Sequence, residues 1–166
     1  MQGHYNYVFD NITDTYNFTT RNDILYRVAF VVDETFSSIS GEEIPNIYQL
    51  VVEKANDETE PLDSRVSATI ENIIERFFND ERNALIYICS DTDNKANLRN
   101  KVFNRWYQKS KYKDVIFKIE KALPIKSPGF PEQQIYTSFM FHKQNPNYKK
   151  LKEIYNKIDD VLNNDK

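Results

Sequence analysis

The stretch from Ala84 to Lys109 constrains the fold most, because its pattern changes from that of a strand to that of a helix within a few residues. The apolar run from Leu85 to Cys89 is short and rich in β-branched and aromatic residues, which predicts a buried strand. Turn and cap formers follow at 90–94. The helix after them is predicted to bury a stripe that recurs every four residues and is widened by one aromatic: Leu98, Val102, Trp106 and Phe103.

The rest of the chain adds strands on both sides of this unit and two more helices. Alternation with a period of two predicts strands near 5–9, 16–18, 24–33, 47–55, 115–123 and 135–142. In the strand at 115–123 we expect Phe117 and Ile119 to point inward, and Lys118 and Glu120 to point outward. Apolar spacing predicts a helix capped by Asp63 or Ser64, and another that starts at Asn145-Pro146. Residues 34–46 are polar and predict a loop.

Together these elements predict a single α+β domain over residues 1–166, with the order ββββαβαββα. A meander of strands, followed by helices that bracket one strand, favours a mixed and mostly antiparallel sheet. We expect six to seven strands flanked by three helices. The strands at Ile47 and Leu85 are joined through a helix and should be parallel neighbours.

Composition indicates a soluble cytoplasmic protein. A single cysteine among 166 residues excludes an intrachain disulfide framework and fits a reducing compartment. The sequence has no export signal and no run near the roughly 20 apolar residues that span a bilayer. We therefore expect no membrane association.

Charge is distributed very unevenly along the chain. Residues 1–94 hold 6 basic and 18 acidic residues, whereas residues 95–126 hold 10 basic and only 2 acidic residues. Most of these cations lie in the helix predicted after the buried strand, or directly next to that helix. We expect seven of them to bind a partner: Lys95, Arg99, Lys101, Arg105, Lys109, Lys111 and Lys113.

Three interpretations of these cations remain open. They can form a solvated face that pairs with acidic loops of the same chain, such as residues 53–63. They can bind an acidic protein partner, or they can bind nucleic acid with Tyr107 and Tyr112 stacking on bases. A sequence pI of about 5.5 disfavours nucleic acid, because domains that bind it usually have values above about 9.

Few residues qualify for catalysis or metal binding. Asp91 and Asp93 are weak candidates for Mg²⁺ ligands, and the alternative is that they cap the following helix. Cys89 lies in the most apolar strand, where packing in the core is the favoured role of a free thiol. His4 and His142 lie in separate strands without zinc-ligand spacing. We expect no catalytic residue, no metal and no cofactor.

The run from Asp63 to Trp106 resembles a family of small bacterial proteins known as a domain of unknown function. The segments that carry the resemblance are Asp63-Ser64-Arg65-Val66, Thr69-Ile70, Ile73-Ile74, Phe77-Phe78, Leu85-Ile86-Tyr87-Ile88-Cys89, Arg99, Phe103 and Trp106-Tyr107. This resemblance implies no particular activity.

The order of elements from Ile47 to His142 is similar to the second half of the acetyl-CoA-dependent N-acetyltransferase fold. That family opens the helix after its fourth strand with a glycine-rich loop, which holds the cofactor's pyrophosphate at the helix N-terminus. Here the position is Glu60-Pro61-Leu62-Asp63-Ser64-Arg65-Val66, with two carboxylates and no glycine. Asn97, Arg99 and Phe103 only approximate that family's later motif, and Phe103 falls near the place of its tyrosine acid.

The function that follows is a non-catalytic interaction module, an accessory, inhibitor or defence-related subunit, that binds an acidic partner through its basic helix. A divergent acyl-CoA-dependent N-acetyltransferase is the first alternative, and a nucleic-acid-binding protein is the second.

Overall fold

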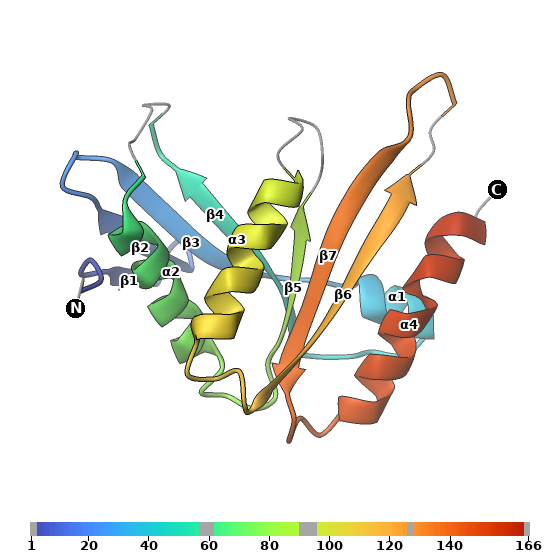
Figure 1. Cartoon of the computed structure of the whole chain (residues 1–166). Helices are drawn as coiled ribbons and strands as arrows, with labels where there is room; N and C mark the ends of the chain where they lie inside the picture. Colours follow the sequence, from blue (N-terminus) through green and yellow to red (C-terminus); the bar gives the residue numbers. More distant parts are fainter. Residues whose placement is uncertain (1–2, 57–61, 90–95, 126–127, 165–166) are drawn as a thin grey trace. The chain divides into compact units, whose positions relative to one another are not determined.

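A computed structural model describes residues 3–56, 62–89, 96–125 and 128–164 of the chain (Figure 1). These residues contain seven strands in one sheet and four helices. The strands are β1 (Val8–Asp10), β2 (Thr15–Thr19), β3 (Leu25–Val32), β4 (Ile47–Lys54), β5 (Ala84–Cys89), β6 (Ile116–Ile125) and β7 (Gln133–His142). The helices are α1 (Thr35–Ser40), α2 (Ser64–Phe77), α3 (Ala96–Lys109) and α4 (Tyr148–Asn164). None of the helices in these ranges is long and apolar enough to cross a membrane.

The predicted fold class is confirmed, with one helix more than expected. The sheet has the order β1-β2-β3-β4-β5-β7-β6 and is mostly antiparallel, and β4 and β5 are the predicted parallel neighbours. The predicted loop at 34–46 is wrong in part, because it contains α1. Phe36 anchors α1 in the core, and Gly41 ends it in a left-handed conformation at φ 70°. A helix of six residues is too short to show a 3.6-residue period.

The chain forms two compact units, and each consists of two separate segments. The first unit is Met1–Val31 with Leu50–Asn79, and the second is Val32–Gln49 with Asp80–Lys166.

The first unit contains an antiparallel meander and α2. The β1–β2 hairpin pairs Phe9 with Tyr16, and β2 continues antiparallel into β3. Aromatic rings hold this unit together: Phe18 stacks on Tyr26 with centroids 5.1 Å apart. The buried face of α2 is the predicted one, with Ile70, Ile73 and Ile74 inside. Burial of such side chains is the main stabilising term for a helix of this length.

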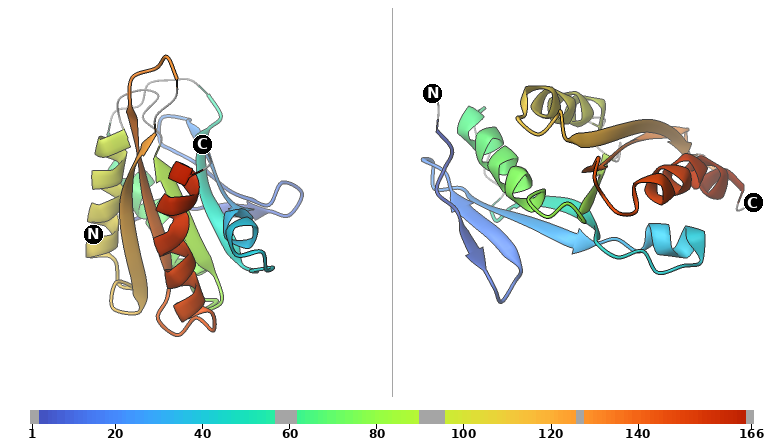
Figure 2. Two further views of the ribbon diagram at one scale, coloured as in Figure 1. Left: turned by 90° about the vertical axis from the view of Figure 1, so that its right-hand side faces the viewer. Right: turned by 90° about the horizontal axis from the view of Figure 1, so that it is seen from below.

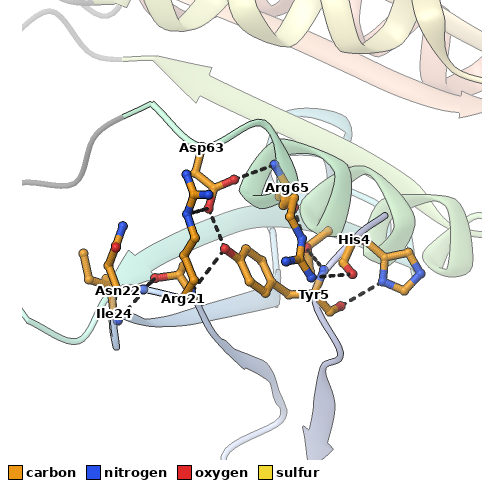
Figure 3. A network of polar contacts seen from close by, with 9 residues as sticks. His4, Tyr5, Arg21, Asn22, Ile24, Asp63 and Arg65 are labelled. Carbon is orange, nitrogen blue, oxygen red and sulfur yellow. Dashed lines mark hydrogen bonds and ion pairs between the residues drawn. The ribbon is translucent and has the colours of Figure 1, made fainter. Parts of the chain in front are cut away.

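Asp63 caps α2, as predicted, and also ties the N-terminal segment to that helix (Figure 3). Its carboxylate accepts a hydrogen bond from the backbone N–H of Arg65 at 2.9 Å and another from the hydroxyl of Tyr5 at 2.5 Å. The Arg21 side chain lies 3.9 Å away, and Arg65 stacks over the Tyr5 ring at 4.0 Å. The Tyr5 hydrogen bond in particular holds the pKa of Asp63 below its usual value.

Replacing Asp63 with alanine should lower the free energy of unfolding by about 1–2 kcal/mol, because the variant loses a helix cap and leaves the Tyr5 hydroxyl without its acceptor. Tyr5→Phe keeps the cap and removes only the hydroxyl, so it should cost less. Urea denaturation followed by circular dichroism measures both variants. Equal losses for the two variants would contradict the capping role.

In the second unit, α3 covers one face of the sheet formed by β5, β7 and β6, and α1 and α4 cover the other (Figure 2). The core lies on the face beneath α4. Every second residue of a strand points to the same side, and on this side many of those residues are apolar and buried. Phe139 lies at the centre of the core, between Phe36 at 4.6 Å and Tyr155 at 5.4 Å. The buried members are Phe36, Ile44, Ile47, Ala84, Ile86, Leu123, Phe139, Phe141, Leu151, Ile154, Tyr155 and Ile158.

The turn before α4 is fixed by Asn145, which is buried. Its side-chain oxygen accepts a hydrogen bond from the Asn147 backbone at 2.9 Å, and its amide donates to the carbonyl of Arg82 at 3.0 Å. The predicted helix start at Asn145-Pro146 is therefore correct to within one turn, since α4 begins at Tyr148.

Candidate interaction surface

The orientation of α3 is set by two residues that face the sheet. Phe103 is 3% exposed and stacks on Tyr87 of β5, with ring centroids 4.3 Å apart, and Ala96 is fully buried one heptad earlier. Leu98 was predicted to belong to the buried stripe, and this prediction is wrong, because Leu98 is 62% exposed. Val102 and Trp106 are half-buried at the margin of the contact. The buried face thus follows an i, i+7 pair instead of the four-residue repeat.

Five of the predicted partner-binding residues are exposed, and we call them the basic ridge: Lys101, Arg105, Lys109, Lys111 and Lys113. Lys101, Arg105 and Lys109 recur every four residues and so share one side of α3. Lys111 and Lys113 lie in the turn between α3 and β6. No side chain of the basic ridge pairs with a carboxylate in the part of the chain that the structure describes.

The other two predicted cations do not belong to the basic ridge. Arg99 is half-buried, and its side chain lies near the thiol of Cys89 on β5, where it opposes the effect of burial on the pKa of that thiol. It therefore lies on the side of α3 that faces the sheet, one turn before Phe103. Lys95 lies outside the described residues.

The residues considered for metal binding and catalysis are Asp91, Asp93 and Cys89. Asp91 and Asp93 lie outside the described residues, and the described residues contain no group of three metal-ligating side chains. Cys89 is buried. Burial raises the pKa of its thiol, against the smaller opposing effects of Tyr87 and Arg99, which is the opposite of what a nucleophile needs.

The tyrosines predicted to stack on bases are not available for that role. Tyr112 is 8% exposed. Tyr107 is half-buried, and its hydroxyl donates to the carbonyl of Ile116 at 2.8 Å and lies 3.3 Å from that of Lys113. Its ring is therefore fixed between α3 and the start of β6 instead of being free at the surface.

Lys118 was predicted to point outward, and the structure places it beneath α3 with its side chain 5% exposed. Its ammonium group contacts the side-chain oxygen of Asn104 and the carboxylate of Glu120, and it lies 5.5 Å from the centroid of the Tyr107 ring. Burial lowers the pKa of Lys118, while Glu120 acts in the opposite direction. Sequence alone gave no signal for this position, because it does not show that α3 covers this face of β6.

A groove of about 460 Å³ opens beside Lys118, between the C-terminal half of α3 and the first half of β6. One wall consists of Asn104, Tyr107 and Gln108, which share one side of α3. The other wall is the β6 segment 117–120. The groove therefore lies next to the basic ridge, and Lys118 is its buried cation.

Replacing Lys118 with methionine should change the pH dependence of stability. Since the pKa of Lys118 is lower in the folded state than its ordinary value of 10.5, the unfolded chain binds more protons between these two values. Wild type should therefore gain stability relative to Lys118→Met as the pH rises toward 10.5. Urea denaturation of both proteins at pH 7 to 10 measures the difference. A constant difference would show that burial does not perturb this amine.

The residues at the N-terminus of α2 do not fit acetyl-CoA, the cofactor of the N-acetyltransferase fold. The Asp63 carboxylate already accepts the hydrogen bond of the Arg65 backbone N–H, where a pyrophosphate would need this donor. A second acid, Glu60, precedes it in sequence. Phosphate oxygens would be repelled there.

A family model matches a large part of the chain. The model of the family described as "Family of unknown function (DUF6169)" matches residues 62–157, which is more than half of the chain. The chain belongs to DUF6169. No curated protein and no solved structure matches it. The match to DUF6169 begins just before α2 and ends within α4, so it includes the whole basic ridge and the groove beside Lys118.

Proposed function

We propose that the protein is a non-catalytic interaction module that binds an acidic protein partner through the basic ridge. The observation that carries this proposal is that five exposed cations on α3 and its following turn have no carboxylate partner among the described residues. Unpaired cations on one surface attract an anionic partner over a distance of about a Debye length and fix its orientation.

Leu98 supports a protein partner over a nucleic acid. On a helical wheel it falls between Arg105 and Lys109, so a large exposed apolar side chain lies among the cations. Protein interfaces combine an apolar centre with a charged rim, whereas a nucleic-acid surface contacts phosphates and stacks bases on aromatic rings. Tyr112 is buried, and the protein carries a net charge of −3.

Co-purification from the source cells tests this function. The tagged protein is recovered at low and at moderate salt, with and without nuclease. A partner that survives nuclease and is lost as salt rises supports an acidic protein. A partner that nuclease removes would support the nucleic-acid alternative, and no partner under any condition would contradict both.

The N-acetyltransferase alternative has one observation in its favour, the parallel pairing of Ile47–Gln49 with Ala84–Ile86. Against it stands the Asp63 carboxylate at the N-terminus of α2. Calorimetric titration with acetyl-CoA decides between the two. Saturable binding would replace the non-catalytic proposal with this one.

A further inference from the structure

Strand β6 forms an edge of the sheet, since it is last in the strand order and pairs with β7. The backbone of Ile116 shows which of its residues face outward. The Ile116 N–H donates to the carbonyl of Tyr112 at 2.8 Å, and its own carbonyl accepts from the Tyr107 hydroxyl at 2.8 Å, so neither group bonds to β7. Val115 is the inward neighbour, because its carbonyl accepts from the N–H of Lys143.

Backbone groups alternate between the two sides of an antiparallel strand. Lys118, Glu120 and Ala122 therefore share the orientation of Ile116 and point their N–H and C=O groups away from β7. Tyr107 closes this edge at Ile116. At Lys118, Glu120 and Ala122, no side chain of the described residues is hydrogen-bonded to the outward N–H and C=O groups. Glu120 and Ala122 are exposed. This edge is open for hydrogen bonding from Lys118 to Ala122.

The groove beside α3 lies along this same segment of β6, since its β6 wall is formed by residues 117–120. A strand added to the edge would pass the groove, and one of its side chains would enter it. Lys118 lines the groove and donates to Asn104 and Glu120. A carboxylate that enters the groove would lie near this ammonium donor, which the Glu120 carboxylate already contacts.

Further cations surround the groove. Lys101 lies three residues before Asn104, and Arg105 lies three residues before Gln108, so both border the α3 wall. The contact between the Tyr107 hydroxyl and the Lys113 carbonyl places the turn at 111–113 beside the same wall. Charge complementarity therefore favours an acidic occupant. A second copy of this chain is disfavoured, because pairing β6 with β6 would bring the two basic ridges together.

We propose that the outer edge of β6, from Lys118 to Ala122, accepts an extended acidic segment of the protein partner as an additional strand. This inference rests on the proposed function and specifies how the partner binds: main-chain hydrogen bonds supply affinity, and the groove and the basic ridge select acidic side chains.

Ala122→Pro tests the edge without changing any charge. It removes one outward N–H and places a ring on the edge, and β6 already carries Pro124 in the same outward register. The probe is a fluorescein-labelled peptide, Gly-(Asp-Val)4-Gly, followed by fluorescence anisotropy at low salt. We expect Ala122→Pro to weaken binding at least about tenfold relative to wild type. Ala122→Val keeps the N–H and should bind as wild type does.

A second measurement leaves the protein unchanged and keeps the test valid if Ala122→Pro is unstable. Two versions of the same peptide are N-methylated, one at the odd-numbered and one at the even-numbered residues. The version that loses the N–H groups facing β6 should bind at least about tenfold more weakly. Octaglutamate, which has eight acids but low β propensity, should bind more weakly than the alternating peptide.

Two results would overturn the edge proposal while leaving the proposed function standing. One is equal affinity of wild type and Ala122→Pro, together with equal affinity of the methylated peptides, which would show binding by charge alone. The other is absence of peptide binding to wild type while a nuclease-resistant, salt-sensitive partner is still recovered from cells. Failure of that recovery would instead contradict the proposed function itself.

Discussion

Lys101→Glu, Arg105→Glu and Lys109→Glu, introduced together, should abolish capture of the acidic partner. The triple variant changes the charge on one side of α3 by six units, and these side chains are exposed and do not hold the fold together. Each glutamate would repel an acidic partner where a cation attracted it before. The repulsion should lower the association rate constant as well as the affinity. Pull-down from the source cells, with the partner band quantified, measures the effect.

The control carries the same charge change elsewhere on the surface. Arg27, Arg76 and Lys157 are exposed and lie outside α3 and the basic ridge, so their replacement by glutamate should leave capture unchanged apart from a modest general effect of net charge. Loss of the partner with the control triple, or its retention with the α3 triple, would contradict the basic ridge as the binding surface.

Phe139→Ala should cost about 3–5 kcal/mol of unfolding free energy, which is a large part of the stability of an ordinary domain. Phe139 is fully buried, and its ring contacts Phe36, Phe141 and Tyr155 with centroids 4.6 to 5.4 Å apart. Alanine would leave a cavity between a strand, two helices and their aromatic rings. The loss combines the transfer free energy of the ring with the cost of that cavity.

The single tryptophan makes this measurement specific to the second unit. Trp106 lies in α3, in the same unit as Phe139, so its fluorescence during urea denaturation reports on this unit. Val32→Ala, at an exposed position of the same unit, should change stability by less than about 0.5 kcal/mol. A comparable loss for both variants would show that the buried aromatic cluster is not the main source of stability.

Most of the secondary structure could be predicted, because regular elements repeat their pattern several times. Alternation over five or more residues identified β3, β4 and β7, and the i, i+4, i+7 spacing identified α2 with its Asp63 cap. Helix α1 has fewer than two turns, so no repeat marks it. The single buried ring of Phe36, at the first turn of α1, gives no periodic signal either.

The site was predicted less completely, since a sequence shows which residues are apolar but not which elements cover them. Leu98 and Phe103 are both apolar residues of one helix, and only the position of Tyr87 decides that Phe103 is buried. In the same way, Lys118 is polar by type but lies beneath α3, where Asn104 and Glu120 provide its partners. Charge density in sequence predicted the exposed basic ridge, but it did not distinguish these five cations from the half-buried Arg99.

The two-segment construction of each unit limits how the protein can be dissected. Residues 32–49 complete the second unit, and they contribute Phe36, Ile44 and Ile47 to its buried cluster. A fragment restricted to residues 62–157 would omit all three and leave their neighbours facing water. Studies of binding by truncation therefore need residues 32–49 as well as the stretch that matches the family model.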